Sequence, residues 1–106
     1  KDIIFLPDKK NKNHKLWKKY FNLYNGLITF SIHKKKNISL FLDNLQLFKI
    51  GFSWGGYESL IIPINNLSPV IKSCQNSVFW FRIHVGLESS RDLIDDLKKG
   101  FFEYEK

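Results

Sequence analysis

The segment VFWFRIHV at residues 78–85 decides the fold. Aromatic and β-branched side chains crowd into it, and such residues favour the pleated, half-buried surface of a strand. Because successive side chains point to opposite faces, one face of this strand is apolar throughout and the other carries a cation. The apolar face holds Phe79, Phe81, Ile83 and Val85, and the other face holds Val78, Trp80, Arg82 and His84. We therefore expect a buried strand here, with Arg82 in its middle.

Other segments are expected to form strands beside this one. LITFSIH at 27–33 alternates apolar and polar side chains, as a half-buried strand does. Short strands are expected at 50–53 and 58–62, on either side of a Trp-Gly-Gly bend. The apolar run at 3–6 is a candidate edge strand.

Apolar side chains recur at helical spacing in three segments. A first helix is expected at 14–21, and Asn37 could cap a second one that reaches Phe48. Ser89 begins a capping box that is typical of the start of a helix. A short helical turn is possible at 67–73. The expected buried faces are Leu16, Trp17, Tyr20 and Phe21; Ile38, Phe41, Leu42, Leu45 and Phe48; and Leu93, Ile94, Leu97, Phe101 and Tyr104.

These elements predict an α+β fold, with helices packed on one face of a small, mainly antiparallel sheet. The chain has 106 residues, which suffices for one compact domain at 1–106. Hydrophobic residues make up 43% of it, so a real core is expected.

Composition argues against several kinds of partner. The net charge is +7, but fifteen of the seventeen basic residues are lysine and alanine is absent. A/T-rich codons produce that profile without selecting a binding face, so we expect no nucleic-acid partner. No apolar run is long enough to cross a bilayer, so no membrane partner is expected. A single cysteine, Cys74, favours a reducing compartment such as the cytoplasm. The three histidines lack metal-ligand spacing, so no metal site is expected.

Two features could bind an anion. The planar guanidinium of Arg82 matches a carboxylate in two parallel hydrogen bonds, although an arginine on the wet face of a sheet would have the same sequence context. Gly55 and Gly56 permit a positive φ and a close backbone approach, and such a bend can turn N–H groups towards one point. A plain hairpin turn is the alternative for the glycines. The residues alone leave both alternatives open.

Three stretches together resemble one family. HKLWKKYFNLYNGLITFSI (14–32), FKIGFSWGGYESLIIP (48–63) and FRIHVGLESSRDLIDDLKKGF (81–101) are similar, in this order, to the C-terminal domain of the Cys/Met-metabolism pyridoxal-phosphate (PLP) enzymes. The short sequences Ser-Trp-Gly-Gly-Tyr and Arg-Ile-His-Val-Gly resemble those of the bacterial cystathionine β-lyase branch. The resemblance implies the small C-terminal domain of a fold-type I PLP enzyme. It also implies that these residues are the C-terminal part of a longer chain, without its PLP-binding large domain.

The resemblance also implies roles for particular residues. In the family, the residues at the positions of Ser53, Trp54 (through its backbone) and Arg82 hold the α-carboxylate of the substrate, and Gly55 and Gly56 would shape the supporting bend. Holding the carboxylate orients the Cα–H bond for deprotonation. In the β-lyase branch, a step of methionine biosynthesis, cystathionine yields homocysteine, pyruvate and ammonia. The intact family forms homodimers that pair into homotetramers.

One element that the family needs does not occur in this chain. The Schiff-base lysine of the family lies in a Ser-x-x-Thr-Lys type of segment, and the 106 residues contain none. PLP is therefore expected in the full-length enzyme. This chain alone is expected neither to bind PLP tightly nor to turn over substrate.

Three alternatives stay open. A related trans-sulfuration enzyme (a γ-synthase, a γ-lyase or a cysteine desulfhydrase) would use the same scaffold. A basic nucleic-acid-binding module could use the aromatic strand as a stacking platform, and would then depend on Trp80. A structural remnant without activity is the third alternative.

Overall fold

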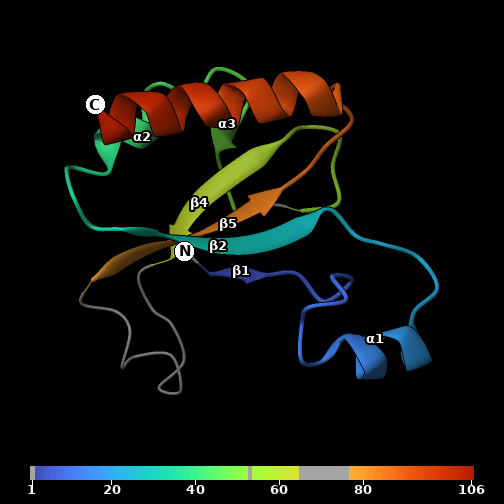
Figure 1. Ribbon diagram of the computed structural model, residues 1–106. Helices are drawn as coiled ribbons and strands as arrows, with labels where there is room; N and C mark the ends of the chain where they lie inside the picture. The colour runs from blue at the N-terminus through green and yellow to red at the C-terminus, as the bar shows by residue number, and fades with distance from the viewer. Residues whose placement is uncertain (1, 53, 65–76) are drawn as a thin grey trace.

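The computed structural model describes residues 2–52, 54–64 and 77–106. Five strands form one sheet in the order β1-β2-β5-β4-β3 (Figure 1). The central strand β5 pairs antiparallel with β2 and with β4. β1 is antiparallel to β2, whereas β3 is parallel to β4. The strands are β1 (Ile3–Ile4), β2 (Leu27–His33), β3 (Lys49–Ile50), β4 (Leu60–Ile64) and β5 (Val78–His84). The strand expected from VFWFRIHV is thus the middle of the sheet.

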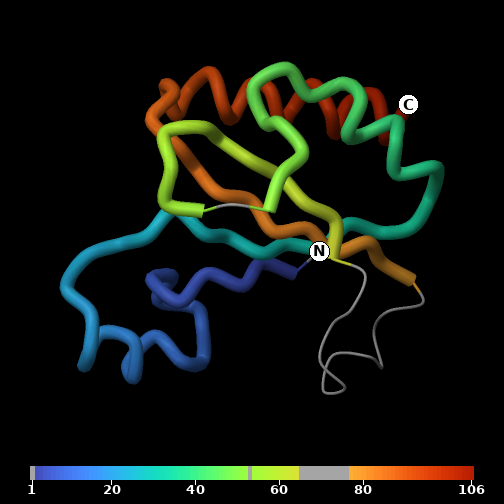
Figure 2. The backbone as a smooth tube through the Cα atoms, turned by 180° about the vertical axis from the view of Figure 1, so that it is seen from behind, coloured from blue at the N-terminus to red at the C-terminus, as the bar shows by residue number. Residues whose placement is uncertain are grey.

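Two of the three helices cover one face of the sheet. α2 (Ser39–Leu42) and α3 (Ser90–Glu105) lie on the same side of it, and α1 (His14–Tyr20) lies on the other side, beyond β1 (Figures 1 and 2). α3 begins as predicted, because Oγ of Ser89 accepts the backbone N–H of Asp92 at 3.5 Å. The α+β class is confirmed, as a small mixed sheet with a helical layer on one face.

The core lies between this face and the two covering helices. Phe30 of β2 pairs with Phe81 of β5, and their rings stack at 5.3 Å. Phe41 of α2 stacks on Phe101 of α3 at 4.8 Å. Phe41 and Phe81 are fully buried. The apolar face of β5 therefore points into the core, as its alternation predicts.

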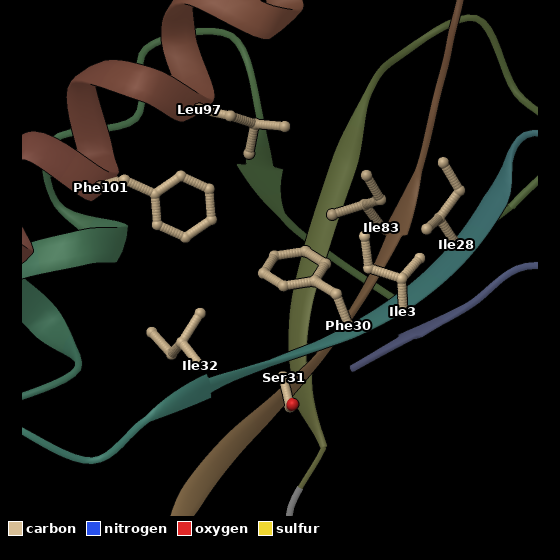
Figure 3. Close-up of a pocket in the computed structure, with 8 residues that line it drawn as sticks. All are labelled: Ile3, Ile28, Phe30, Ser31, Ile32, Ile83, Leu97 and Phe101. Atoms are coloured by element: carbon tan, nitrogen blue, oxygen red, sulfur yellow. The ribbon is translucent and has the colours of Figure 1, made fainter. Parts of the chain in front are cut away.

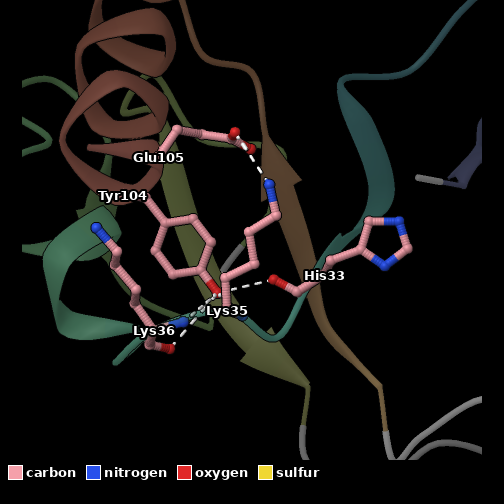
Figure 4. Close-up of polar contacts among 5 residues, drawn as sticks. All are labelled: His33, Lys35, Lys36, Tyr104 and Glu105. Carbon is pink, nitrogen blue, oxygen red and sulfur yellow. Dashed lines mark hydrogen bonds and ion pairs between the residues drawn. The ribbon is translucent and has the colours of Figure 1, made fainter.

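Tyr104, near the end of α3, ties this helix to the segment that follows β2 (Figure 4). Its hydroxyl donates to the carbonyl of His33 at 2.8 Å and accepts the N–H groups of Lys35 at 3.0 Å and Lys36 at 3.4 Å. An ion pair at 3.2 Å joins Lys35 to Glu105 on the surface beside it. Because the phenol is buried with its hydroxyl satisfied, it contributes both apolar packing and a polar connection.

The core leaves a space near β1. A cavity of about 300 Å³ lies between α3 and β2 (Figure 3). β1 has only two residues, and the side chain of Ile3 is 68% exposed, so this edge strand does not close the space. The lining residues are Ile3, Ile28, Phe30, Ser31, Ile32, Ile83, Leu97 and Phe101.

The second helix is much shorter than its spacing predicts. α2 ends at Leu42, although Phe48 is still buried. The carboxylate of Asp96 on α3 accepts the N–H groups of Gln46, Leu47 and Phe48 at 2.7, 3.0 and 3.1 Å. These backbone donors bond a side chain of α3, so the apolar residues reach the core without a continuing helix.

Two predicted helix faces are partly wrong. In α1 only Trp17 is buried, and its ring stacks on Tyr24 at 5.6 Å. The other three expected residues, Leu16, Tyr20 and Phe21, are more than half exposed because α1 lies away from the covering layer. Ile94 of α3 is 52% exposed. Asn37 does bond the start of α2, since its Oδ1 accepts the N–H of Ser39.

The strands on either side of the bend differ from the expected bounds. β3 ends at Ile50, and β4 continues through Pro63 to Ile64. Proline is tolerated there because β3 pairs with Leu60 and Ile61, so that among the described residues β4 is an edge strand at Pro63. The helical turn expected at 67–73 falls outside the described residues. No helix of the described ranges is long and apolar enough to cross a membrane.

Candidate functional site

The glycine-containing segment is a crossover loop between two parallel strands. Residues 51–59, here called the crossover loop, join β3 to β4. A plain hairpin turn joins antiparallel neighbours, so that alternative is wrong. The loop contacts Arg82, His84 and the residues that follow β5. It therefore lies over the carboxyl end of the central strand, on the polar face predicted from the sequence.

Arg82 is fastened to the beginning of this loop. One guanidinium nitrogen, Nη2, donates to the carbonyl of Phe52 at 2.6 Å. The carbon Cζ lies 4.9 Å from the centre of the Trp54 ring, a distance at which a cation is attracted to an aromatic face. Arg82 is partly exposed, and Trp54 is 61% exposed. The cation is thus fixed in direction while part of it still reaches solvent.

His84 holds the glycines of the loop. Its Nδ1 lies 3.4 Å from the backbone nitrogen of Gly55, and its Nε2 lies 3.0 Å from the carbonyl oxygen of Gly56. A backbone N–H can only donate and a carbonyl can only accept, so the proton of the neutral ring must sit on Nε2. Gly55 has φ +78°, a conformation that other residues rarely adopt. The positive φ predicted for this bend is confirmed at Gly55.

The end of the loop is bonded to the turn between β5 and α3. The backbone N–H and the hydroxyl of Ser59 donate to the two carboxylate oxygens of Glu88 at 2.9 and 2.6 Å. The same hydroxyl accepts the N–H of Gly86 at 2.9 Å. The hydroxyl and then the N–H of Ser59 lower the pKa of Glu88 below its usual value. We call these three residues, Ser59, Gly86 and Glu88, the Ser59 clamp.

Glycine is required at position 86 by a close approach. A Cβ there would lie 2.3 Å from the carbonyl oxygen of Tyr57 and 2.6 Å from the carbonyl carbon of Glu58. The adjacent Leu87 donates its N–H to the same Tyr57 carbonyl at 2.9 Å. The Tyr57 side chain itself is 71% exposed. A hydrogen bond with Glu58, and then the charge of Glu58, raise the pKa of the Tyr57 phenol.

Several of the site residues expected from the sequence do lie together. Arg82, Trp54, Gly55 and Gly56 form one cluster. Ser53 falls outside the described residues. Sequence reasoning did not identify His84 as part of the site, although its place on the same strand face as Arg82 was a usable signal.

This arrangement can bind a planar anion. A guanidinium carries five N–H donors, and Nη2 of Arg82 makes a bond to Phe52. Neighbouring donors of a guanidinium match a carboxylate in two parallel bonds. Trp80 is only 6% exposed, so its ring does not offer a stacking surface for nucleic acid. Every lysine among the described residues is exposed. Within the described ranges, no three potential metal ligands lie together.

Comparison with known proteins gives a consistent result. The family model for Cys/Met metabolism PLP-dependent enzymes matches residues 1–102. A cystathionine beta-lyase of Salmonella typhimurium is 42% identical over 99 residues, covering 86% of this chain and 25% of that protein. An L-alanine/L-glutamate racemase of Wolbachia pipientis is 39% identical over 103 residues, covering 92% of this chain and 25% of that protein. The structure of a cystathionine gamma-lyase from Lactobacillus plantarum with L-serine superposes with a TM-score of 0.78 at 27% identity, covering 99% of this chain and 29% of the other. The chain thus spans about a quarter of the length of its curated relatives.

Proposed function

The chain belongs to the Cys/Met metabolism PLP-dependent enzymes, and from this membership we propose that it supplies the substrate-carboxylate site of a cystathionine β-lyase. The observation that carries the proposal is the fixed guanidinium of Arg82, held by the Phe52 carbonyl and the Trp54 ring. The residues are proposed to be the C-terminal domain of a longer enzyme. That enzyme would convert cystathionine and water to homocysteine, pyruvate and ammonia.

The proposed work of this domain is to orient the substrate. Arg82 would bind the α-carboxylate in two parallel hydrogen bonds, and the loop at Ser53 and Trp54 would offer further donors to it. A carboxylate held at both oxygens fixes the direction of the Cα–H bond, which is a large part of what a positioning site contributes to rate. Gly55 and Gly56 let the backbone approach closely enough for this.

The cofactor is proposed to be held elsewhere in the longer enzyme. The 106 residues contain no Ser-x-x-Thr-Lys type of segment, so none of their lysines is assigned to the family's covalent bond to PLP. The longer enzyme is proposed to be a homodimer or homotetramer of the cytoplasm, and its mass in solution would test the oligomeric state.

A racemase is the second candidate, because the Wolbachia racemase is 39% identical to this chain over an alignment that covers 92% of it. Racemisation and β-elimination both begin with loss of the proton from Cα, so the same carboxylate site serves either reaction. The products distinguish them. Release of pyruvate from cystathionine indicates a lyase, and formation of D-alanine or D-glutamate indicates a racemase. The γ-lyase and γ-synthase alternatives are tested in the same assays through their own products.

The test begins with the coding sequence upstream of residue 1. An open frame with a Ser-x-x-Thr-Lys type of segment allows the full-length holoenzyme to be made and assayed with cystathionine. We expect Arg82→Lys to lower kcat/KM by about 10 to 100-fold, since a lysine cannot make the paired bonds of a guanidinium. Arg91→Lys is the matched control, because Arg91 is exposed on α3, and it should retain activity. Equal activity of the two variants, or a frame interrupted just before residue 1, would count against the proposal.

A further inference from the structure

We infer that His84 is a positioning residue for the carboxylate site, acting through the crossover loop and not on the substrate itself. This inference rests on the proposed function and deepens it. His84 is 7% exposed, and both of its ring nitrogens are engaged by the loop. A buried imidazole with both nitrogens bonded in opposite senses has one orientation and one tautomer.

The two contacts of His84 fall on consecutive residues of the loop. The Gly55 N–H donates to Nδ1 and the Gly56 carbonyl accepts from Nε2, so the ring bonds the peptide group before Gly55 and the peptide group after Gly56. Turning over the peptide before Gly55 would place a carbonyl against Nδ1, and turning over the peptide after Gly56 would place an N–H against the protonated Nε2. Either change would be an unfavourable contact in a buried place. His84 therefore selects one of the backbone conformations that a pair of glycines would otherwise allow.

The loop is held at a second point by the same strand. Arg82 and His84 are two residues apart on one face of β5, and Arg82 bonds the carbonyl of Phe52. Trp54 lies between the two attachment points, and its ring contacts the guanidinium. Fixing the loop on both sides of Trp54 fixes the ring against Arg82, and fixes the backbone that would face a bound carboxylate.

The geometry distinguishes His84 from the other groups that hold the loop. The Ser59 clamp fastens the end of the loop, beyond Tyr57, and makes its contacts with the turn after β5. His84 is the side chain that bonds the two glycines among the described residues. Loss of His84 should thus loosen the carboxylate site while the clamp and the sheet stay in place.

The test uses the full-length holoenzyme with His84→Ala, His84→Gln and His84→Asn. Glutamine places an amide N–H near the position of Nε2, and asparagine places an acceptor near the position of Nδ1. We expect His84→Ala to raise KM for the amino-acid substrate about tenfold with a smaller change in kcat. Glutamine should recover more than asparagine, because the bond to Gly56 is the shorter one. His33→Ala is the matched control, since His33 is exposed at the far end of β2 and should leave KM unchanged.

Hydrogen exchange supplies a readout that does not depend on turnover. In His84→Ala, peptides covering the crossover loop should exchange faster, while peptides of α3 should exchange at the rate of the parent enzyme. Unchanged exchange in the loop, an unchanged KM, or equal acceleration in α3 would each overturn the positioning role. If His84→Ala does not fold, the glutamine and asparagine variants decide by the same criteria.

The Arg82→Lys variant distinguishes a failure of the proposed carboxylate site from a failure of the inference about His84. An unchanged KM in Arg82→Lys means that the carboxylate site itself has been wrongly assigned, whatever His84 does. A raised KM in Arg82→Lys together with parent-like KM and loop exchange in His84→Ala overturns only the inference about His84.

Discussion

Replacing Asp96 by asparagine should destabilise the domain by about 3 kcal/mol. Asp96 is 7% exposed, and its two oxygens accept three backbone N–H groups, those of Gln46, Leu47 and Phe48. An asparagine has one oxygen and one NH2 group, so at least one of these donors must face another donor. An unsatisfied buried donor costs about 1–3 kcal/mol. The bonds that remain lose the charge of the acceptor, and with it about half their strength.

The assay is urea unfolding followed by tryptophan fluorescence, with the free energy of unfolding taken by linear extrapolation. A small domain has a free energy of unfolding of about 5–15 kcal/mol, so a loss of about 3 kcal/mol is readily measured. Asp95→Asn is the matched control, because this neighbouring carboxylate is exposed and pairs with Lys98 at the surface. It should change the free energy of unfolding by less than about 0.5 kcal/mol. Equal stabilities for the two variants would refute the reasoning that Asp96 replaces helical hydrogen bonds in the segment after α2.

Three further changes test other parts of the structure. Tyr104→Phe should lower the free energy of unfolding in urea by about 2 kcal/mol, because the backbone carbonyl of His33 and the N–H of Lys35 lose their hydrogen bonds to the hydroxyl. Gly86→Ala should cost about 1–3 kcal/mol or more by the same measurement, since the new methyl group would overlap backbone atoms that cannot move aside easily. The lowered pKa of Glu88 means that its ionised form stabilises the fold above the usual carboxyl pKa of 4.5, and that this contribution is lost as the pH falls through the lower pKa of the folded state. Glu88→Gln should flatten that part of the profile of unfolding free energy against pH.

Each of these three changes has a matched control. Tyr20→Phe removes the hydroxyl of a tyrosine that is 67% exposed, and should be neutral. Gly56→Ala adds a methyl group where no described atom beyond the neighbouring residues lies within 4 Å, so it should cost far less than the change at Gly86. Glu103→Gln removes a surface partner of Lys106 and should leave the acid limb of the pH profile in place. A control that matched its test variant would contradict the corresponding structural reason.

The sheet was the most predictable part of the fold, because its signal is local. The alternation in residues 78–85 and 27–33 defines two core faces that meet in register, with Phe30 opposite Phe81. The second helix was less predictable. Its apolar spacing continues to Phe48, but the hydrogen bonds of that segment go to Asp96, which is 48 residues away in the sequence. No local pattern reports a partner at such a distance.

The residues of the candidate site could be predicted from the sequence, but their connections could not. The residue types of Arg82 and of the glycine bend are compatible with anion binding, which stays a prediction. β3 pairs parallel with β4, and the sequence of the connecting residues 51–59 does not indicate this pairing. The roles of His84 and of Ser59 with Glu88 follow from that path, so they emerge only once the loop has been placed in space.

The central position of β5 also has a consequence for the order of folding. Leu27 pairs with His84 and His33 with Val78, so the β2–β5 contacts close loops of about fifty residues. β4 also pairs with β5, so it cannot complete its pairing before β5 is present. Contacts this far apart slow folding, because the entropy of loop closure is lost before any pairing energy is gained. During synthesis β2 and β4 would leave the ribosome without their common neighbour, and would stay unpaired on that side until β5 followed. The strand that carries Arg82 is thus also the one whose arrival lets the sheet form.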